Sequence, residues 1–326
     1  MNNVAIITLN WKDADTTIAC LQSLMRQDHP YFQVFILDNG SHDGSVEKIE
    51  KWGIAGPGEN FVSLTIEEAK DTIPTQKIVL LKSNENLGFA GGNNLVMRMA
   101  IESGFQYIWL INNDTVQAEN ALSALIGAAE SNIKAGMVTS KVLYFSKPEV
   151  IESMGSKLFI PLGIFRHIGQ GMKASEAPSV PFEVPLVYGC SFIIKEELIK
   201  DTGFMDERFF LLIEEGDWCI RARKKGWKIL SAPASAVWHK VSRSIGKRSD
   251  IFFYYVTRNT LLFMKKHYPV FLPLTVLAMF PLVSGLIVAD SLFSERKNSA
   301  RRLKMVLLGY LHFLQGRFGK LMEANR

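Results

Sequence analysis

The sequence predicts an α/β protein built around a mostly parallel sheet. Four short apolar, β-branched runs occur in the first third of the chain, and segments with helical spacing of apolar residues separate them. Strands that alternate with helices form βαβ units, whose crossovers place the carboxyl ends of the strands along one sheet edge. We therefore expect a ligand site at that edge and helices on the faces of the sheet.

Four strands and three helices are expected in the first third of the chain. The strands are predicted at residues 4–9, 33–38, 77–82 and 105–111. Between the first two strands, apolar residues recur at helical spacing, namely Ile18, Leu21, Leu24 and Met25. Two further helices are predicted at residues 44–52 and 95–104.

The rest of the chain is less regular. Residues 144–186 are rich in Gly, Pro and Ser without a sustained period, which is typical of a long loop or a hairpin that leaves a compact domain. Residues 187–195 return to strand character, and a helix is expected from about Glu214. Residues 228–240 are predicted to form two short strands.

Composition and charge narrow the class of protein. About half of the residues are hydrophobic and both charge signs are common, so a globular fold is expected. The net charge is +5, but residues 296–326 hold eight Lys or Arg and one Glu, a net of +7, so the rest sums to −2. Nucleic-acid binding by the main body is therefore not expected. Three scattered cysteines argue against a disulfide framework or a zinc site and indicate a reducing compartment.

Polar clusters at the ends of strands are the main functional signal. They occur at Asn10, at residues 38–45, in the glycine-rich residues 84–94 and at residues 112–115. One strand that ends in Asp or Asn is common, because turns favour these residues. Four such ends on one sheet edge indicate a shared ligand.

We make more detailed predictions for two of these clusters, residues 38–45 and residues 84–94. Asp43 is expected to cap the helix that follows the second strand. The glycines of residues 84–94 let backbone N–H groups approach a ligand closely. Asn93 and Asn94 are expected to open the next helix.

The ligand must suit carboxylates and amides. The chain has neither a Walker-type phosphate loop nor a Gly-x-Gly-x-x-Gly motif after the first strand. A carboxylate repels a phosphate unless a divalent cation lies between them, and Mg²⁺ and Mn²⁺ accept oxygen ligands from both. Asp114 is therefore predicted to hold a metal that bridges a nucleotide diphosphate, and Asp38 to accept hydrogen bonds from a base or ribose.

Seven motifs in this order resemble those of the family 2 glycosyltransferases, which have the GT-A fold. They are "DNGSHDGS", "NLGFAGGNN", "NNDT", "GFMDERFF", "EEGDWCIRARKKGW", "WHKVSRSIGK" and "YYVTRNTLLFMKKH". The resemblance covers about residues 3–268 and extends to bacterial rhamnosyltransferase-like enzymes of surface polysaccharide assembly. It implies a GT-A type fold and transfer of a sugar from a nucleotide-diphosphate donor to a saccharide acceptor.

The resemblance also implies site residues. Residues 112–114 stand at the family's Asp-x-Asp metal site, with Asn112 in place of the first Asp. Arg243 and Lys247 are candidates for contact with phosphate. The residues expected to hold the nucleotide sugar are Asn10, Asp38, Asp43, Gly88, Gly91, Gly92, Asn94 and Asn113, with Asp38 and Asp43 on the nucleoside. Those expected at the Mg²⁺ or Mn²⁺ ion are Asp114, Asn112 and His239.

Transfer to a hydroxyl requires a general base behind the acceptor. Glu214, Glu215 and Asp217 offer three carboxylates at the expected start of a helix. In the family the second residue of an acidic pair is the base, which corresponds here to Glu215, a Glu where the family has Asp. Attack opposite the leaving group inverts the anomeric centre, as the resemblance implies.

Residues 1–267 are predicted to form the catalytic domain and residues 268–326 to associate with a membrane. Residues 268–289 carry no charge and approach the length of a transmembrane helix, although two prolines disfavour a straight span. Residues 299–322 are expected to form a basic amphipathic helix. This combination favours anionic lipid at the cytoplasmic face of the cell membrane, with the protein peripheral or monotopic and a lipid-linked saccharide acceptor within reach.

Two other functions stay open. A sugar nucleotidyltransferase has a related nucleotide-binding sheet, but residues 8–17 lack the basic glycine-rich loop expected of it near the first strand. A catalytically silent nucleotide-sugar-binding scaffold is consistent with Asn112 and with Glu in place of Asp at position 215. Turnover of a nucleotide sugar would exclude the scaffold.

Overall fold

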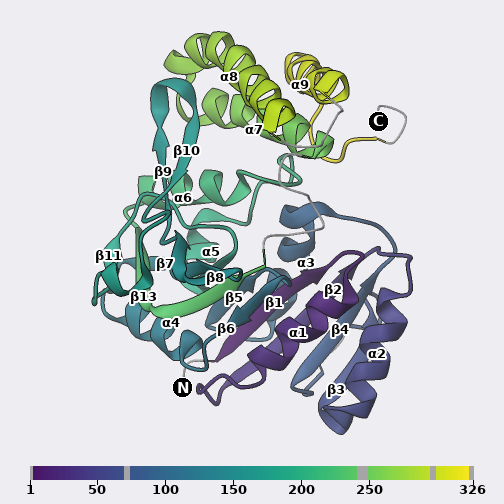
Figure 1. Ribbon diagram of the computed structural model, residues 1–326. Coiled ribbons are helices and arrows are strands. Elements are labelled where there is room, and N and C mark those ends of the chain that lie inside the picture. The colour runs from purple at the N-terminus through teal and green to yellow at the C-terminus, as the bar shows by residue number, and fades with distance from the viewer. Residues whose placement is uncertain (1–2, 70–73, 241–248, 294–298, 323–326) are drawn as a thin grey trace.

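One large sheet organises the protein (Figure 1). The computed structural model describes residues 3–69, 74–240, 249–293 and 299–322. Within these residues, the strands form an eleven-stranded sheet and a separate two-stranded hairpin. Helices pack on both faces of the large sheet. The predicted α/β class with a mostly parallel sheet is confirmed.

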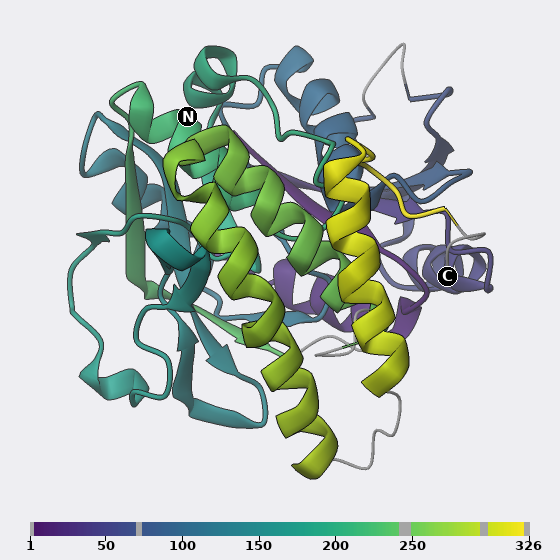
Figure 2. The ribbon, with the colours of Figure 1, turned by 90° about the horizontal axis from the view of Figure 1, so that it is seen from above.

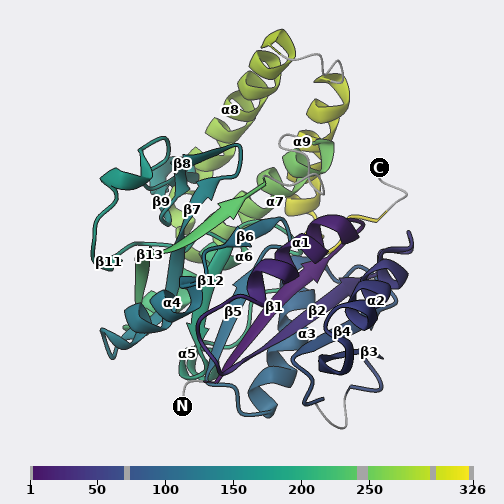
Figure 3. The same ribbon diagram turned by 60° about the horizontal axis from the view of Figure 1, so that its bottom comes forward.

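The first half of the sheet is a parallel βαβ arrangement, in the order β5–β1–β2–β4–β3 (Figure 3). Its strands include all four predicted ones, with ends shifted by at most two residues. The elements are β1 (Val4–Asn10), α1 (Ala14–Leu24), β2 (Phe32–Asn39), α2 (Ser45–Ala55), β3 (Phe61–Thr65), β4 (Ile78–Ser83), α3 (Gly88–Glu102) and β5 (Tyr107–Ile111).

The second half of the chain extends the sheet beyond β5. β12 (Ser191–Lys195) is antiparallel to both of its neighbours, β5 and β7 (Ala135–Tyr144), whereas β13 (Lys228–His239) is parallel to β7. Short antiparallel strands border this part. The remaining elements are β6 (Thr115–Gln117), α4 (Ala121–Glu130), β8 (Lys147–Ser153), β11 (Phe182–Glu183), α5 (Glu196–Thr202) and α6 (Glu214–Lys224).

Two irregular segments take definite forms. Residues 228–239 form one strand rather than the predicted two, with a register shift between Ala232 and Ala236. Pro233 lies inside this shift, where its missing N–H breaks no ladder. Residues 144–186, predicted to form a long loop or a hairpin, contain a hairpin. It consists of β9 (Ser156–Phe159) and β10 (Ile164–His167).

The sheet is buried on both faces because its strands are apolar at successive positions. Successive side chains of a strand point to opposite faces. In β1, Ile7 packs on the same side as Val96 of α3, and Ile6 packs on the same side as Leu21 of α1. A continuous apolar run is what a sheet between two helical layers requires.

Three helices near the end of the chain form a further layer: α7 (Asp250–His267), α8 (Leu272–Phe293) and α9 (Ser299–Leu314). Seen from above, α9 runs beside α7 (Figure 2). Phe263 of α7 belongs to the main core, whereas Phe253 of α7 packs with Val283 of α8 and Val306 of α9. α7 therefore connects this layer to the sheet. The predicted division after residue 267 falls at the end of α7 and stays a prediction.

α8 exposes apolar side chains to solvent. Leu274, Leu277, Phe280 and Leu282 are all exposed, and Leu277 most of all at 74%. Across the described parts of the chain, no helix combines the length and the apolar character needed to cross a membrane.

Candidate active site

The ends of β1 and β2 meet in a buried polar cluster. Their register pairs Asn10 with Asp38, and Nδ2 of Asn10 donates to Oδ1 of Asp38 at 2.7 Å. Ser41 donates to the same carboxylate twice, from its backbone N–H to Oδ2 at 3.1 Å and from its hydroxyl to Oδ1 at 2.6 Å. Asp38 is buried and firmly oriented. Only its remaining lone pairs are open to a nucleoside.

The same cluster extends to the residues that follow β5. The Thr17 hydroxyl of α1 donates to Oδ1 of Asn10 at 2.7 Å and accepts from Nδ2 of Asn113 at 2.8 Å. The neighbouring Asn112 is half-buried. Asn10, Asp38 and Asn113 therefore lie together at one sheet edge.

Asp43 lies just before α2 but does not cap it. The helix begins at Ser45, and Gly44 occupies the cap position with a φ of 87°. Glycine adopts this left-handed conformation without strain. Oδ1 of Asp43 accepts from the backbone N–H of Ser45 at 3.1 Å, and the residue is exposed. Its carboxylate is thus accessible to a ligand.

The glycine-rich stretch serves packing. α3 begins at Gly88, so Asn94 lies inside the helix and does not open it. A Cβ at Gly88, where φ is 76°, would lie 2.4 Å from the carbonyl oxygen of Phe210. A Cβ at Gly92 would lie 3.2 Å from a side chain of β1. Gly88 and Gly92, expected to admit a ligand, instead admit neighbouring parts of the protein.

Asn94 is committed to the segment that follows α5. Its Nδ2 donates to the carbonyl oxygen of Met205 and to Oε1 of Glu207, both at 2.9 Å, and its Oδ1 accepts from the backbone N–H of Met205 at 3.1 Å. Gly91 faces the same Glu207, whose Cδ would lie 3.9 Å from a Cβ there. Asn94 therefore positions protein backbone, and its assignment to the nucleotide sugar stays a prediction.

A buried His and two carboxylates form the second part of the site. β6 pairs with the end of β13, with Thr115 opposite His239, which brings Asp114 to the imidazole. Nε2 of His239 lies 3.3 Å from Oδ1 of Asp114, and Nδ1 lies 2.7 Å from Oε2 of Glu152 on β8. The Tyr188 hydroxyl donates to Oε1 of Glu152 at 3.3 Å. Asp114 and His239 were predicted from the sequence, whereas Glu152 and Tyr188 were not.

Glu152 gives only a weak signal in the sequence. It lies between two buried residues, Ile151 and Ser153, in a strand whose other carboxylate, Glu149, is exposed. A charge in such a run is rarely buried unless it has a partner. The candidate phosphate contacts Arg243 and Lys247 fall outside the described residues.

This cluster has the donors of a divalent-cation site. Both carboxylate oxygens of Asp114 and Nε2 of His239 are buried and make no hydrogen bond within the described residues. A metal-ligating His generally has its other ring nitrogen held by a carboxylate, as Glu152 holds His239. Oxygen and imidazole ligands suit Mn²⁺. In the described part of the chain no three His, Cys, Asp or Glu side chains form a complete metal site, so Asp114 and His239 would be a partial ligand set.

His239 is held between two carboxylates. Burial lowers the pKa of its imidazole, but the contacts with Asp114 and Glu152 outweigh burial and raise the pKa to about 9. Burial and the nearby negative groups raise the pKa of the Tyr188 hydroxyl well above its ordinary value. At neutral pH His239 is therefore a cation, and a metal that binds it must displace the proton.

Glu214 and Glu215 begin α6 directly after residues 208–213, which we call the α6 turn. Three residues of this turn, Phe210, Leu212 and Ile213, have φ values of 62°, 71° and 76°. Side chains other than glycine rarely adopt this left-handed region. Such a backbone persists only where its surroundings enforce it, and it is frequent at functional sites.

The two glutamates have different surroundings. Burial raises the pKa of both carboxyl groups. At Glu214 the charge of Glu215 adds to burial, and the pKa lies well above its ordinary value. At Glu215 backbone hydrogen bonds, including one from Gly189, oppose the rise in pKa. Paired carboxyl groups that differ in this way divide the roles of acid and base. Burial and the charge of Glu215 disfavour the ionised form of Glu214, whereas backbone hydrogen bonds at Glu215 favour its carboxylate form.

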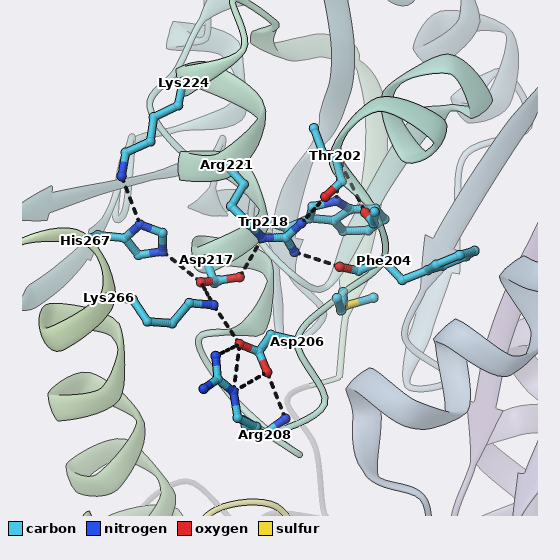
Figure 4. A network of polar contacts seen from close by, with 12 residues as sticks. Thr202, Phe204, Asp206, Arg208, Asp217, Trp218, Arg221, Lys224, Lys266 and His267 are labelled. Atoms are coloured by element: carbon cyan, nitrogen blue, oxygen red, sulfur yellow. Dashed lines mark hydrogen bonds and ion pairs between the residues drawn. The ribbon is translucent and has the colours of Figure 1, made fainter.

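Asp217 belongs to an ion-pair network between α6 and α7 (Figure 4). Its oxygens lie 2.9 Å from Nε of Arg221, 2.5 Å from Nζ of Lys266 and 2.7 Å from Nε2 of His267. Burial raises the pKa of this carboxyl, but the bonds from His267 and Lys266 outweigh burial and lower it. Lys266 also contacts Asp206 at 2.6 Å. Asp217 thus ties two helices together, and its assignment as a catalytic residue stays a prediction.

Residues 188–190 connect the two parts of the site. The Tyr188 hydroxyl binds the carboxylate that holds His239. A Cβ at Gly189 would lie 2.9 Å from Oε1 of Glu215. The carbonyl oxygen of Cys190 accepts from the first backbone N–H after β5 at 2.9 Å. Three consecutive residues therefore contact the His239 cluster, the candidate base and the end of β5.

Comparison with known proteins gives one family and several distant relatives. The family model described as "Glycosyl transferase family 2" matches residues 3–203. The dTDP-rhamnosyl transferase RfbF of Shigella flexneri is 21% identical over 79% of this chain and 85% of its own length. An N-acetylglucosaminyl-diphospho-decaprenol L-rhamnosyltransferase of Mycobacterium tuberculosis is 23% identical over 84% of this chain and 88% of its own length.

Solved structures share the fold. The mannosyltransferase PcManGT from Pyrobaculum calidifontis, in complex with GDP-Man and Mn²⁺, has a TM-score of 0.57 at 13% identity and covers 97% of this chain and 88% of its own. The structure of TarS 1–349 from S. aureus has a TM-score of 0.51 at 13% identity, with 97% and 82% covered. The predicted GT-A type fold is confirmed.

The raised pKa of His239 predicts a pH-dependent stability when a chelator keeps metal away. The protonated imidazole stabilises the fold, so its contribution is complete below pH 6.5, the ordinary pKa, and is lost as the pH rises through about 9. The unfolding temperature should fall across this window, and His239→Gln should flatten the fall. His42→Gln, at an exposed His, should keep the wild-type slope. If the unfolding temperatures of wild type and His239→Gln fall equally with rising pH, the protonated His239 is not the group that stabilises the fold.

Proposed function

Since the chain belongs to glycosyl transferase family 2, we propose that it moves a sugar from a nucleotide-diphosphate donor to a hydroxyl of a saccharide acceptor, with inversion at the anomeric carbon. Glycosyltransferase activity follows from the family and the relatives. The proposal concerns the residues that carry the reaction and the class of its substrates.

The observation that carries this proposal is the contact of residues 188–190 with both parts of the site. Gly189 contacts Glu215, and the neighbouring Tyr188 binds the carboxylate that holds His239. The polar ends of β1 and β2 adjoin the same sheet edge. Reactants held at adjoining places in fixed orientation react far faster than free ones.

Glu215 would act as the general base. It takes the proton of the acceptor hydroxyl while that oxygen attacks the anomeric carbon from the face opposite the nucleotide diphosphate. The new carbon–oxygen bond forms as the bond to the phosphate oxygen breaks, and the configuration inverts. Burial and the charge of Glu215 disfavour a second negative charge on Glu214 beside the base.

The polar strand ends would hold the nucleoside part of the donor. Asp38 is oriented by Asn10 and Ser41, and its remaining lone pairs can accept from a base or ribose. Asp43 is exposed beside it and adds a second acceptor. Asn113 extends this surface toward the cluster of Asp114.

Asp114 and His239 would hold a divalent cation, with Asn112 next to them. Such a cation, when bound, neutralises the charge of the departing nucleotide diphosphate. Glu152 and Tyr188 orient the imidazole so that its Nε2 faces Asp114. A solved structure of the same fold is complexed with Mn²⁺, which supports Mn²⁺ or Mg²⁺ here.

The proposed substrates are a hexose or deoxyhexose donor and a lipid-linked saccharide acceptor. Two distant relatives are rhamnosyltransferases by name, and one name specifies a diphospho-decaprenol substrate. These names support a role in the assembly of cell-envelope polysaccharide. The silent scaffold is the second candidate, because Asn112 replaces a family carboxylate. Within the described residues, Asp114 and Glu215 have buried carboxylate oxygens that make no hydrogen bond, which favours the enzyme.

We also propose that α8 and α9 bind the cytoplasmic face of the cell membrane. The exposed leucines and phenylalanine of α8 belong to a helix that contacts α9, which exposes three further leucines, Leu307, Leu311 and Leu314. Exposed cations occur on and just after α9, at Arg301, Lys304, Arg317 and Lys320. An apolar face rimmed by cations suits an anionic lipid surface.

Asp114→Asn tests the metal site. The variant keeps the shape of the side chain but loses the charge, so transfer should fall by about 10²-fold or more. Turnover at increasing Mn²⁺ concentrations should show a higher metal requirement. Asp15→Asn, at an exposed ion-paired carboxylate, should leave turnover unchanged. Near-normal activity of Asp114→Asn with an unchanged metal requirement would sink the metal assignment.

Glu215→Gln and Glu214→Gln form a matched pair for the base. Glu215→Gln should lose about 10²–10⁴-fold in turnover, the usual contribution of a general base. It should still be protected against thermal unfolding by nucleotide diphosphate. Glu214→Gln should keep most activity, because a neutral amide resembles the protonated acid. If Glu214→Gln is the inactive variant, Glu215 is not the base.

Vesicle sedimentation tests the membrane surface. The full chain should sediment with vesicles of phosphatidylcholine and phosphatidylglycerol, and bound protein should stay bound in high salt because apolar insertion is not screened. Leu277→Glu should weaken binding. Ile133→Glu, at a residue 87% exposed but on another part of the surface, should not. Protein that stays in the supernatant at low salt would contradict the membrane proposal.

A further inference from the structure

The α6 turn, which leads into both glutamates, depends on other elements for its shape. Asn259 of α7 donates from Nδ2 to the carbonyl oxygens of Phe209, Leu211 and Leu212, at 2.9, 2.7 and 2.9 Å. The carbonyl oxygen of Phe210 accepts from a backbone N–H at the start of α3 at 2.7 Å. Four consecutive carbonyl groups are thus fixed from outside the turn.

Arg258 links the same turn to residues near the end of the chain. Its guanidinium is buried, and Nη2 donates to the carbonyl oxygens of Arg208 and Phe209 at 3.1 and 3.0 Å. Nη1 donates to the carbonyl oxygen of Gly319 at 2.7 Å. The planar fork of an arginine presents its donors in fixed directions, so that it can hold two segments at once in this way.

Residues 317–321, which we call the C-terminal strap, lie directly against the α6 turn. The backbone N–H of Gly319 donates to the carbonyl oxygen of Arg208 at 2.8 Å. The backbone N–H of Leu321 donates to the Tyr255 hydroxyl at 2.9 Å. The Leu321 side chain is 3% exposed and packs in the same cluster as the apolar side chains of the turn. The strap thus covers the turn on the side of α7 and α9.

We propose that the C-terminal strap and Arg258 are positioning residues for the base, because they hold the α6 turn in the conformation that directs Glu215. This inference rests on the proposed role of Glu215. Loss of the strap would remove an acceptor from the buried Arg258 and a donor from the Arg208 carbonyl. Buried groups left unpaired are unfavourable, so the strap and the turn should loosen together.

Two neighbouring residues separate positioning from general stability. Leu321→Asp places a charge at the buried strap position, and Met322→Asp places the same charge one residue on, where the side chain is 67% exposed. Leu321→Asp should lower kcat by about 10- to 100-fold, the effect of misplacing a catalytic group by about 1 Å. KM for the donor should stay close to wild type, because the strand ends that hold the nucleotide belong to other elements. Met322→Asp should change neither constant.

Hydrogen exchange tests the physical cause without any need for activity. In Leu321→Asp the amides of the α6 turn should exchange faster, while those of β1 and β2 keep their wild-type rates. Leu321→Met, which conserves volume, should restore both kcat and protection. Tyr255→Phe removes one hydrogen bond to the strap and should produce a smaller change of the same kind.

Two outcomes would overturn the proposal. One is wild-type kcat together with wild-type exchange of the α6 turn in Leu321→Asp. The other is a loss of donor affinity and of unfolding temperature that matches the loss of kcat, since this would report a loosened fold. If the wild type turns over no nucleotide sugar, the proposed function fails instead, and the exchange rates still decide whether the strap holds the turn.

Discussion

The close burial of several carboxylates is the constraint on which this site depends. An uncompensated buried charge is strongly unfavourable, so each carboxylate needs its own compensation. The cationic His239 lies between Asp114 and Glu152. Burial and the charge of Glu215 raise the pKa of Glu214, and Glu215 receives backbone N–H groups at the start of a helix. The position of each acidic group therefore follows from the group that neutralises it.

The parts of the site that lie at strand ends could be predicted because their signal is local. A polar residue after an apolar run marks a strand end, and parallel strands bring such ends together, as with Asn10 and Asp38. Asn94 has the same local appearance, yet its partner Met205 is 111 residues away. Glu152 was missed for a related reason, because its partner His239 is 87 residues further on. Only the folded chain reveals which polar residues face a ligand and which face each other.

α7 supports the candidate base from two directions. Near its end, Lys266 and His267 bind Asp217 and so hold the body of α6. About two turns earlier, Arg258 and Asn259 hold the residues that lead into α6. The helix is thus a part of the catalytic unit, and the helices packed on it are mechanically connected to the reaction. A division of the chain into a catalytic part and a membrane part describes sequence regions better than it describes function.

The contact between Gly319 and Arg208 has a consequence for the order of biosynthesis. Chains emerge from the ribosome with the N-terminal side first, and the parallel sheet can assemble before the last helices appear. The strap joins a segment made more than a hundred residues earlier, so the α6 turn gains this support only after residue 321 has emerged. During synthesis the polar ends of β1 and β2 can therefore form before the turn that leads into Glu215 is fully held. If these strand ends hold the donor and Glu215 is the base, binding precedes turnover in the order of assembly.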